Sequence, residues 1–385
     1  MPIAETVFIV MAFLMVGALM AAIFAKVPIP YTVILVLIGA SLQWLAEQIA
    51  VLEPLQHLSL TPEIILFIFL PALIFEAGLG IHARQLAKDI APILMLAIPA
   101  LLISTFIIGY GVSWIAGIPF FVALVFGALI SATDPVAVIA LFKELGAPRR
   151  LTILVEGESL FNDATAIVLF ILVLGILAVG SFSANDFPGI ILDFCIVFLG
   201  GAFLGVVIGS VVSTIVSGMK ILGSGMLVLT LTLAYMAFIV AEHNFHVSGV
   251  MAVTFSALVF GLIVVPRLPE AELHSLHSTW EFLTNICNTL LFILIGYSIN
   301  LANLVSILGL LSLTILLVIL ARASVIYSLV PITVRLLKLP AITWAERHIM
   351  WWGGLKGGLA IANRQHLYSA HSLIHYCPPP KENRI

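Results

Sequence analysis

The stretch from Leu151 to Val179 reads LTILVEGESLFNDATAIVLFILVLGILAV, an apolar run of helical length that carries three carboxylates. About 20 apolar residues are enough to cross the ~30 Å hydrocarbon core of a bilayer as a helix. A charged side chain inside that core costs roughly 2.5–3.5 kcal/mol on insertion scales. Charged residues are retained inside a membrane where they line a cavity and have a functional role. This stretch therefore predicts a membrane helix with a functional polar face.

The whole chain has the composition of an integral membrane protein, whose partner is the lipid bilayer. Its 385 residues are 62% hydrophobic and 9% charged, and the mean hydropathy is +1.23. Soluble domains carry about 25% charged residues. The net charge of −3 indicates no nucleic-acid partner, and the three cysteines have neither metal-ligand nor disulfide spacing. Because nucleophile-elbow and phosphate-loop motifs do not occur, we expect neither an enzyme nor a cofactor.

Apolar runs of spanning length recur along the chain and predict an all-α polytopic membrane protein. The runs are 6–25, 31–50, 61–79, 91–116, 119–142, 151–179, 188–217, 225–241, 247–265, 280–299, 303–333 and 347–362. Up to the last run, the basic residues fall in alternate loops. The positive-inside rule then places the N-terminus outside the cell. Gly201, Gly205 and Gly209 recur every four residues and predict close packing of one helix.

Helical spacing places the polar residues of the opening stretch on one face. Ser159, Asn162 and Asp163 stand at i, i+3 and i+4. Carboxylate, hydroxyl and amide oxygens suit a hard cation such as Na⁺. A desolvated carboxylate also favours its protonated form, so one Asp that binds either a proton or a cation couples the two. The alternative is a set of structural ion pairs, for which Arg322 and Lys356 are the intramembrane bases.

Two spans contain helix-breaking sequences. In SATDP (131–135), Pro135 removes a helix hydrogen bond and pushes Asp134 out of the α region. We expect a break that exposes the Thr133 carbonyl, the alternative being a simple proline kink. The glycines of WGGLKGG (352–358) predict a second interruption. Two broken helices predict inverted repeats with a site between them, and this scheme requires a thirteenth span.

Five motifs in order resemble the monovalent cation:proton antiporters, and among them the NhaP-type sodium/proton antiporters and the animal sodium/hydrogen exchangers. The motifs are LPALIFE (70–76), TDP (133–135), GESLFND (157–163), Arg322 and GGLKG (353–357). The resemblance covers about residues 5–362. It implies a homodimer, in which each protomer has a dimerisation domain and a six-helix core that moves like an elevator.

The resemblance also assigns roles to the ligand residues. The cation is expected on Asp163, with Ser159, the Thr133 backbone and Glu76 as further ligands. From its position alone, Glu76 has three interpretations, a gate, a ligand or a charge that reaches the interface. The expected activity is exchange of Na⁺, or of Li⁺ or K⁺, for H⁺ across the cell membrane by alternating access, which serves pH homeostasis.

Other motif residues are implied to organise the site. Asn162 and Asp134 are expected to hold the crossing of the two broken helices, and Glu158 to pair with Arg322. An Asn before the key Asp, where electrogenic relatives carry a second Asp, implies electroneutral exchange. Lys356 stands where the exchangers usually carry Arg, which keeps the charge but loses bidentate geometry.

Two further functions stay open, a gated cation channel and an inactive membrane remnant. A channel needs a continuous pore with rings of like groups. A remnant is suggested by the polar sequence 363–385, which contains three consecutive prolines and follows the last apolar run. We expect one transporter domain over 1–385, with 363–385 as an atypical, truncated or frame-shifted tail.

Overall fold

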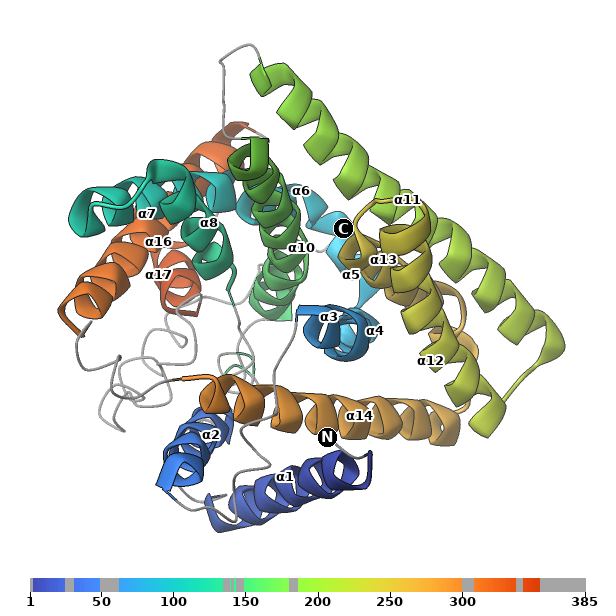
Figure 1. Cartoon of the computed structure of the whole chain (residues 1–385). Helices are drawn as coiled ribbons and strands as arrows, with labels where there is room; N and C mark the ends of the chain where they lie inside the picture. Colours follow the sequence, from blue (N-terminus) through green and yellow to red (C-terminus); the bar gives the residue numbers. More distant parts are fainter. Residues whose placement is uncertain are drawn as a thin grey trace. The chain divides into compact units, whose positions relative to one another are not determined.

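In the computed structural model the chain is described at residues 3–24, 31–48, 62–133, 139, 142, 149–179, 186–299, 308–336 and 342–353. Within these ranges the regular structure is helical and no strand occurs (Figure 1). The elements are α1 (Ile3–Phe24), α2 (Tyr31–Gln48), α3 (Pro62–Ile64), η2 (Ile65–Phe69), α4 (Leu70–Gly80), α5 (Ala83–Lys88), α6 (Ile90–Met95), η3 (Leu96–Ala100), α7 (Leu101–Ala116), α8 (Phe120–Ser131), α10 (Arg149–Val179), α11 (Phe187–Met219), α12 (Ser224–Ile239), η5 (Val240–Asn244), α13 (Gly249–Ile263), η6 (Val265–Arg267), α14 (Glu270–Tyr297), α16 (Leu308–Leu336) and α17 (Trp344–Gly353).

Every predicted apolar run contains a helix. Among the described residues, 8 helices are long and apolar enough to cross a membrane. Three shorter apolar helices, Tyr31–Ala46, Ile65–Gly80 and Phe120–Ser131, account for further predicted runs. Helix α17 covers the start of the last run, and the predicted thirteenth span lies outside the described residues. The prediction of an all-α polytopic protein is confirmed.

The chain divides into two compact units. Unit 1 comprises Met1–Ala87 and Asp163–Thr314, and unit 2 comprises Lys88–Asn162 and Ile315–Ile385. The boundaries fall at the last residue of α5, inside α10 and inside α16, so α10 and α16 each belong partly to both units. A single transporter domain over the whole chain stays a prediction.

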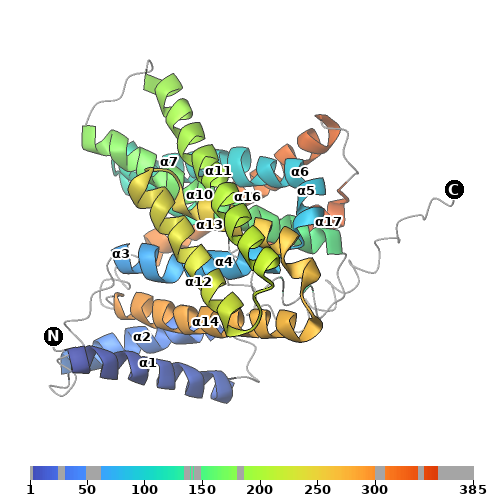
Figure 2. The ribbon, with the colours of Figure 1, turned by 90° about the vertical axis from the view of Figure 1, so that its right-hand side faces the viewer.

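In unit 1, α2 and α14 pack with their backbones in direct contact. A Cβ atom on Gly39 of α2 would overlap the Ile293 backbone, and one on Gly296 of α14 would overlap Val36. The two glycines therefore make a reciprocal close approach. Helix α1 lies beside the same pair, as Figures 1 and 2 show.

Helix α11 of unit 1 packs on α13 through the glycines that recur every four residues. Gly201, Gly205 and Gly209 face Ser248, Ala252 and Ser256 of α13. A side chain at any of the three glycines would meet the α13 backbone. The close helix packing predicted from this spacing is confirmed, and small residues provide it as in other membrane helix pairs.

In unit 2, α8 is held against α7 and α16. A Cβ atom on Gly127 of α8 would contact the Thr105 carbonyl of α7, so the two helices approach closely. The shared apolar core consists of Ile108, Val112, Ala123 and Ala321. This packing fixes the helix whose C-terminal end forms the candidate site.

Replacing Gly205 by Ala is expected to lower the free energy of unfolding by about 1–3 kcal/mol, because the added methyl group must displace the Ala252 backbone. Thermal unfolding of the detergent-solubilised protein measures the effect. Gly218→Ala, in the same helix, is the matched control, since nothing lies within 4 Å of a Cβ atom there. Because Ala has a higher helix propensity than Gly, the Gly218→Ala variant is expected to be as stable as the wild-type protein or slightly more stable. Equal unfolding midpoints for both variants would contradict the packing.

Candidate functional site

The fifth predicted span is interrupted in its middle. Helix α8 ends at Ser131, and the next residue, Ala132, is extended with φ −61° and ψ 141°. The chain therefore leaves the helix ahead of Pro135, which lies outside the described residues. The Ser131 hydroxyl donates to the Gly127 carbonyl at 2.6 Å, which satisfies one acceptor of the final helical turn.

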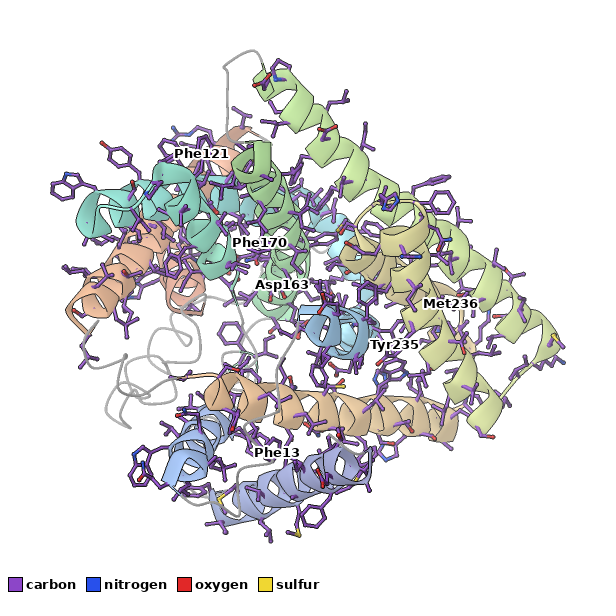
Figure 3. The ribbon with its side chains drawn as sticks, viewed as in Figure 1. Phe13, Phe121, Asp163, Phe170, Tyr235 and Met236 are labelled. Carbon is purple, nitrogen blue, oxygen red and sulfur yellow. The ribbon has the colours of Figure 1, made fainter. Side chains whose placement is uncertain are left out.

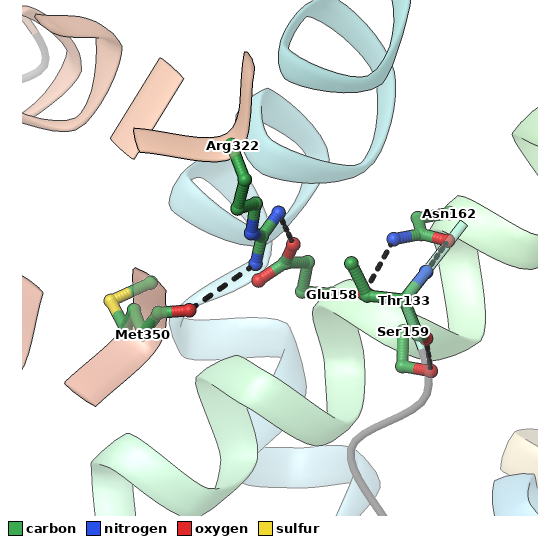
Figure 4. Close-up of polar contacts among 6 residues, drawn as sticks. All are labelled: Thr133, Glu158, Ser159, Asn162, Arg322 and Met350. Carbon is green, nitrogen blue, oxygen red and sulfur yellow. Dashed lines mark hydrogen bonds and ion pairs between the residues drawn. The ribbon is translucent and has the colours of Figure 1, made fainter. Parts of the chain in front are cut away.

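Beyond the break, Thr133 is held by two side chains of α10 (Figure 4). The Ser159 hydroxyl donates to the Thr133 carbonyl at 2.7 Å. The Asn162 Oδ1 atom accepts from the Thr133 backbone N–H at 3.2 Å, and its Nδ2 atom donates to Thr133 Oγ1 at 2.7 Å. All three residues are buried. The backbone groups of Thr133, which a continuous helix would have paired, thus find partners on α10.

Among the described residues, the hydrogen bond between Ser159 and Thr133 uses one of several oxygen lone pairs. A carbonyl and a hydroxyl oxygen each have two lone pairs. The Thr133 carbonyl uses one to accept from Ser159, and the Ser159 oxygen acts only as a donor in this contact. Asn162 is different, because its carbonyl accepts from and its amide donates to the same residue. This use of both ends also fixes which end of the amide is oxygen.

A buried ion pair lies one residue before Ser159. Arg322 of α16 contacts Glu158 of α10 through Nη1, and the side chains are 10% and 1% exposed. The other terminal nitrogen, Nη2, donates to the Met350 carbonyl of α17 at 3.5 Å. Arg322 thus joins α16 to both α10 and α17 within unit 2. Buried opposite charges that meet in this way avoid the cost of a single unpaired charge.

The two further carboxylates predicted as ligands belong to unit 1. Asp163 is partly buried and follows Ser159 by four residues on α10, where Figure 3 labels it. Glu76 is partly buried on α4 in unit 1. Its role as a ligand stays a prediction. Asp134 and Lys356 lie outside the described residues.

The structure brings together Thr133, Ser159 and Asn162, and separately Glu158 with Arg322. Sequence analysis did not find the Met350 carbonyl, because a backbone acceptor carries no residue-type signal. It also missed a hydrogen bond between Tyr327 and His348 on the neighbouring helices. No spacing rule connects two residues on different helices.

A family model described as "Sodium/hydrogen exchanger, transmembrane" matches residues 10–372. The chain is 37% identical over 339 residues to the Na(+)/H(+) antiporter ApNhaP of Aphanothece halophytica, covering 87% of this chain and 62% of that protein. It is 36% identical over 339 residues to the low-affinity Na(+)/H(+) antiporter NhaS1 of Synechocystis, with the same coverage of 87% and 62%. The chain thus spans less than two thirds of the length of these relatives.

The fold is similar to that of the sodium proton antiporter MjNhaP1 from Methanocaldococcus jannaschii. The TM-score is 0.72 at 21% sequence identity, covering 97% of this chain and 86% of that chain. Interrupted membrane helices beside a polar site are typical of secondary transporters. The family match identifies the kind of transporter: the chain belongs to the sodium/hydrogen exchanger family of multi-pass membrane transporters.

Breaking the Glu158–Arg322 pair from one side should cost more stability than removing it entirely. Glu158→Leu or Arg322→Met alone leaves a buried charge without its partner and is expected to cost about 3–5 kcal/mol. The double variant should be more stable than either single variant. Thermal unfolding of the four proteins measures this coupling.

The control for this cycle is the ion pair of Asp89 and Arg150, also in unit 2, at 3.1 Å with side chains 14% and 30% exposed. This pair is more exposed than the Glu158–Arg322 pair, so Asp89→Asn should cost less stability than either single variant of the buried pair. If the losses of the two buried-pair variants simply add in the double variant, the pair is not coupled as described.

Proposed function

We propose that this chain exchanges Na⁺ for H⁺ across the cell membrane, with Asp163 binding either ion. The observation that carries the proposal is the oxygen cluster at the helix break. The Thr133 carbonyl and the Ser159 hydroxyl are held together at 2.7 Å, and Asp163 follows Ser159 by four residues in the sequence of α10. These are oxygen ligands of the kind that a hard monovalent cation takes when it loses water.

The exchange at Asp163 is balanced in charge and atoms. On the cytoplasmic side the protonated carboxyl releases H⁺ and the carboxylate binds Na⁺. After the site turns outward, Na⁺ leaves and a proton from outside binds the same oxygen. Because the two ions compete for one carboxylate, neither is carried without the other. The gradient of one ion therefore drives the other.

The neighbouring Asn162 supports one-for-one stoichiometry. Its amide is neutral, and both its donor and its acceptor are engaged by Thr133. Glu158 of the same motif is paired with Arg322, and we propose Asp163 as the exchanging group. One proton replaced by one monovalent cation moves no net charge.

We further propose a homodimer in the cytoplasmic membrane, with its N-terminus outside the cell. The orientation rests on the basic residues, which occupy alternate loops up to residue 347. Glu76 of α4 is proposed as an additional ligand. Lys356 and Asp134 are proposed to balance the half-helix ends at the crossing.

Na⁺-induced collapse of a pH gradient in everted membrane vesicles tests the exchange. The wild-type chain is expected to dissipate the gradient, and Asp163→Asn to abolish the response, because an amide binds no exchangeable proton. Asp193→Asn is the matched control, since Asp193 is an exposed carboxylate on α11 in unit 1. Repeating the assay with Li⁺ and K⁺ identifies the transported ion.

The same assay separates the alternatives. A channel would give cation flux that does not saturate and is not coupled to protons. A membrane remnant would insert normally and give no response. Equal activity of Asp163→Asn and the wild type would sink the assignment of the exchanging carboxylate.

Electroneutral exchange predicts that the membrane potential does not alter the rate. In proteoliposomes with an imposed K⁺ diffusion potential, the initial rate of Na⁺/H⁺ exchange should be the same at positive, zero and negative potentials. An electrogenic cycle would respond, because moving one net charge through 100 mV changes the energy by about 2.3 kcal/mol. A steep dependence of the rate on potential would rule out one-for-one exchange.

A further inference from the structure

Helix α17 lies antiparallel to α16. In addition to the hydrogen bond between Arg322 and Met350, two polar contacts join these helices. The Tyr327 hydroxyl and His348 Nδ1 are 2.5 Å apart. Further along, the indole N–H of Trp351 donates to the Ile319 carbonyl at 3.2 Å. These contacts set the rotation of α17 about its own axis. All of them lie within unit 2.

The His348 ring is clamped by aromatic side chains. Trp344, His348 and Trp351 stand at i, i+4 and i+7 and share one face of α17. The Trp344 ring stacks on His348 with centroids 5.6 Å apart and planes inclined by 13°. Trp351 contacts the imidazole at 5.3 Å and 57°. Between these rings the imidazole lies with Nδ1 directed at the Tyr327 hydroxyl.

The same helix reaches the candidate site two residues later. The Met350 carbonyl accepts from Arg322 Nη2, while Arg322 Nη1 pairs with Glu158. Arg322 is therefore shared between a carbonyl of α17 and a carboxylate of α10. Glu158 precedes Ser159, whose hydroxyl holds the Thr133 carbonyl. A continuous set of contacts connects the Tyr327–His348 pair to the oxygen cluster.

We propose that Tyr327 and His348 are positioning residues for cation binding. By fixing α17, they keep the Met350 carbonyl on Arg322 Nη2, while Nη1 holds Glu158. Glu158 held in this way fixes the neighbouring Ser159, whose hydroxyl donates to the Thr133 carbonyl that we propose as a cation ligand. This inference rests on the proposed function. It adds the Tyr327–His348 contact, which lies outside the proposed ligand set, as a determinant of Na⁺ affinity.

The Na⁺ concentration for half-maximal exchange distinguishes positioning from a purely structural role. A structural defect reduces the number of active transporters and lowers the maximal rate alone. Loss of the positioning contact should instead raise the half-maximal Na⁺ concentration by about threefold to tenfold, the range that one net hydrogen bond supports.

The experiment compares Tyr327→Phe, His348→Phe and the double variant in everted vesicles. Both single variants keep a ring and remove one partner of the hydrogen bond, and the double variant should be no worse than either. His348→Asn places an amide oxygen near the position of Nδ1 and should restore part of the affinity that His348→Phe loses. The half-maximal Na⁺ concentration for thermal stabilisation is measured on the same purified proteins as a reading of binding alone.

The outcomes separate this inference from the proposed function. Raised half-maximal Na⁺ concentrations that do not add in the double variant support it. Unchanged values with a lowered maximal rate overturn it, as do additive effects or a failure of His348→Asn to recover affinity. Absence of any Na⁺ response in the wild-type protein, in both exchange and thermal stabilisation, overturns the proposed function on which it rests.

Discussion

The candidate site depends on one constraint, that backbone groups freed by a broken helix need partners where lipid offers none. Thr133 meets this constraint through α10. The Ser159 hydroxyl donates to the Thr133 carbonyl. The Asn162 side chain accepts from the Thr133 N–H and donates to the Thr133 hydroxyl. The contacts that stabilise the break also bring the oxygen atoms of Thr133, Ser159 and Asn162 together. The residues that pair the freed backbone groups are therefore the same residues that we propose around the cation.

Charge is the second constraint on this region. Glu158 is nearly inaccessible, and its cost in the interior is offset by Arg322 of α16. Arg322 reaches the Met350 carbonyl as well, so a single guanidinium joins three helices of unit 2. Asp163, in contrast, is only partly buried. A paired, buried acid beside a more accessible one suits a division between structural and exchanging carboxylates.

Much of the fold was predictable, because membrane spans are long apolar runs whose backbone pairs within each helix. The spacing of Gly201, Gly205 and Gly209 also predicted a close helix contact, although not that α13 would be the partner. Helix α14 begins at Glu270, ten residues before the predicted run, because its first three turns are too polar to be recognised by hydropathy. The same limitation applies to the start of α17, which begins at Trp344, three residues before the predicted run.

Within the described residues, the sequence by itself determined the positions and order of the apolar helices, the break ahead of Pro135, and the shared face of Ser159, Asn162 and Asp163. Each of these follows from local chemistry, either hydropathy, proline geometry or helical periodicity. Only the tertiary structure decided that Asn162 uses both ends of its amide on Thr133, and that Arg322 divides its contacts between Glu158 and Met350. Those contacts join segments far apart in the chain, and their geometry depends on how helices pack, which no spacing along one helix encodes.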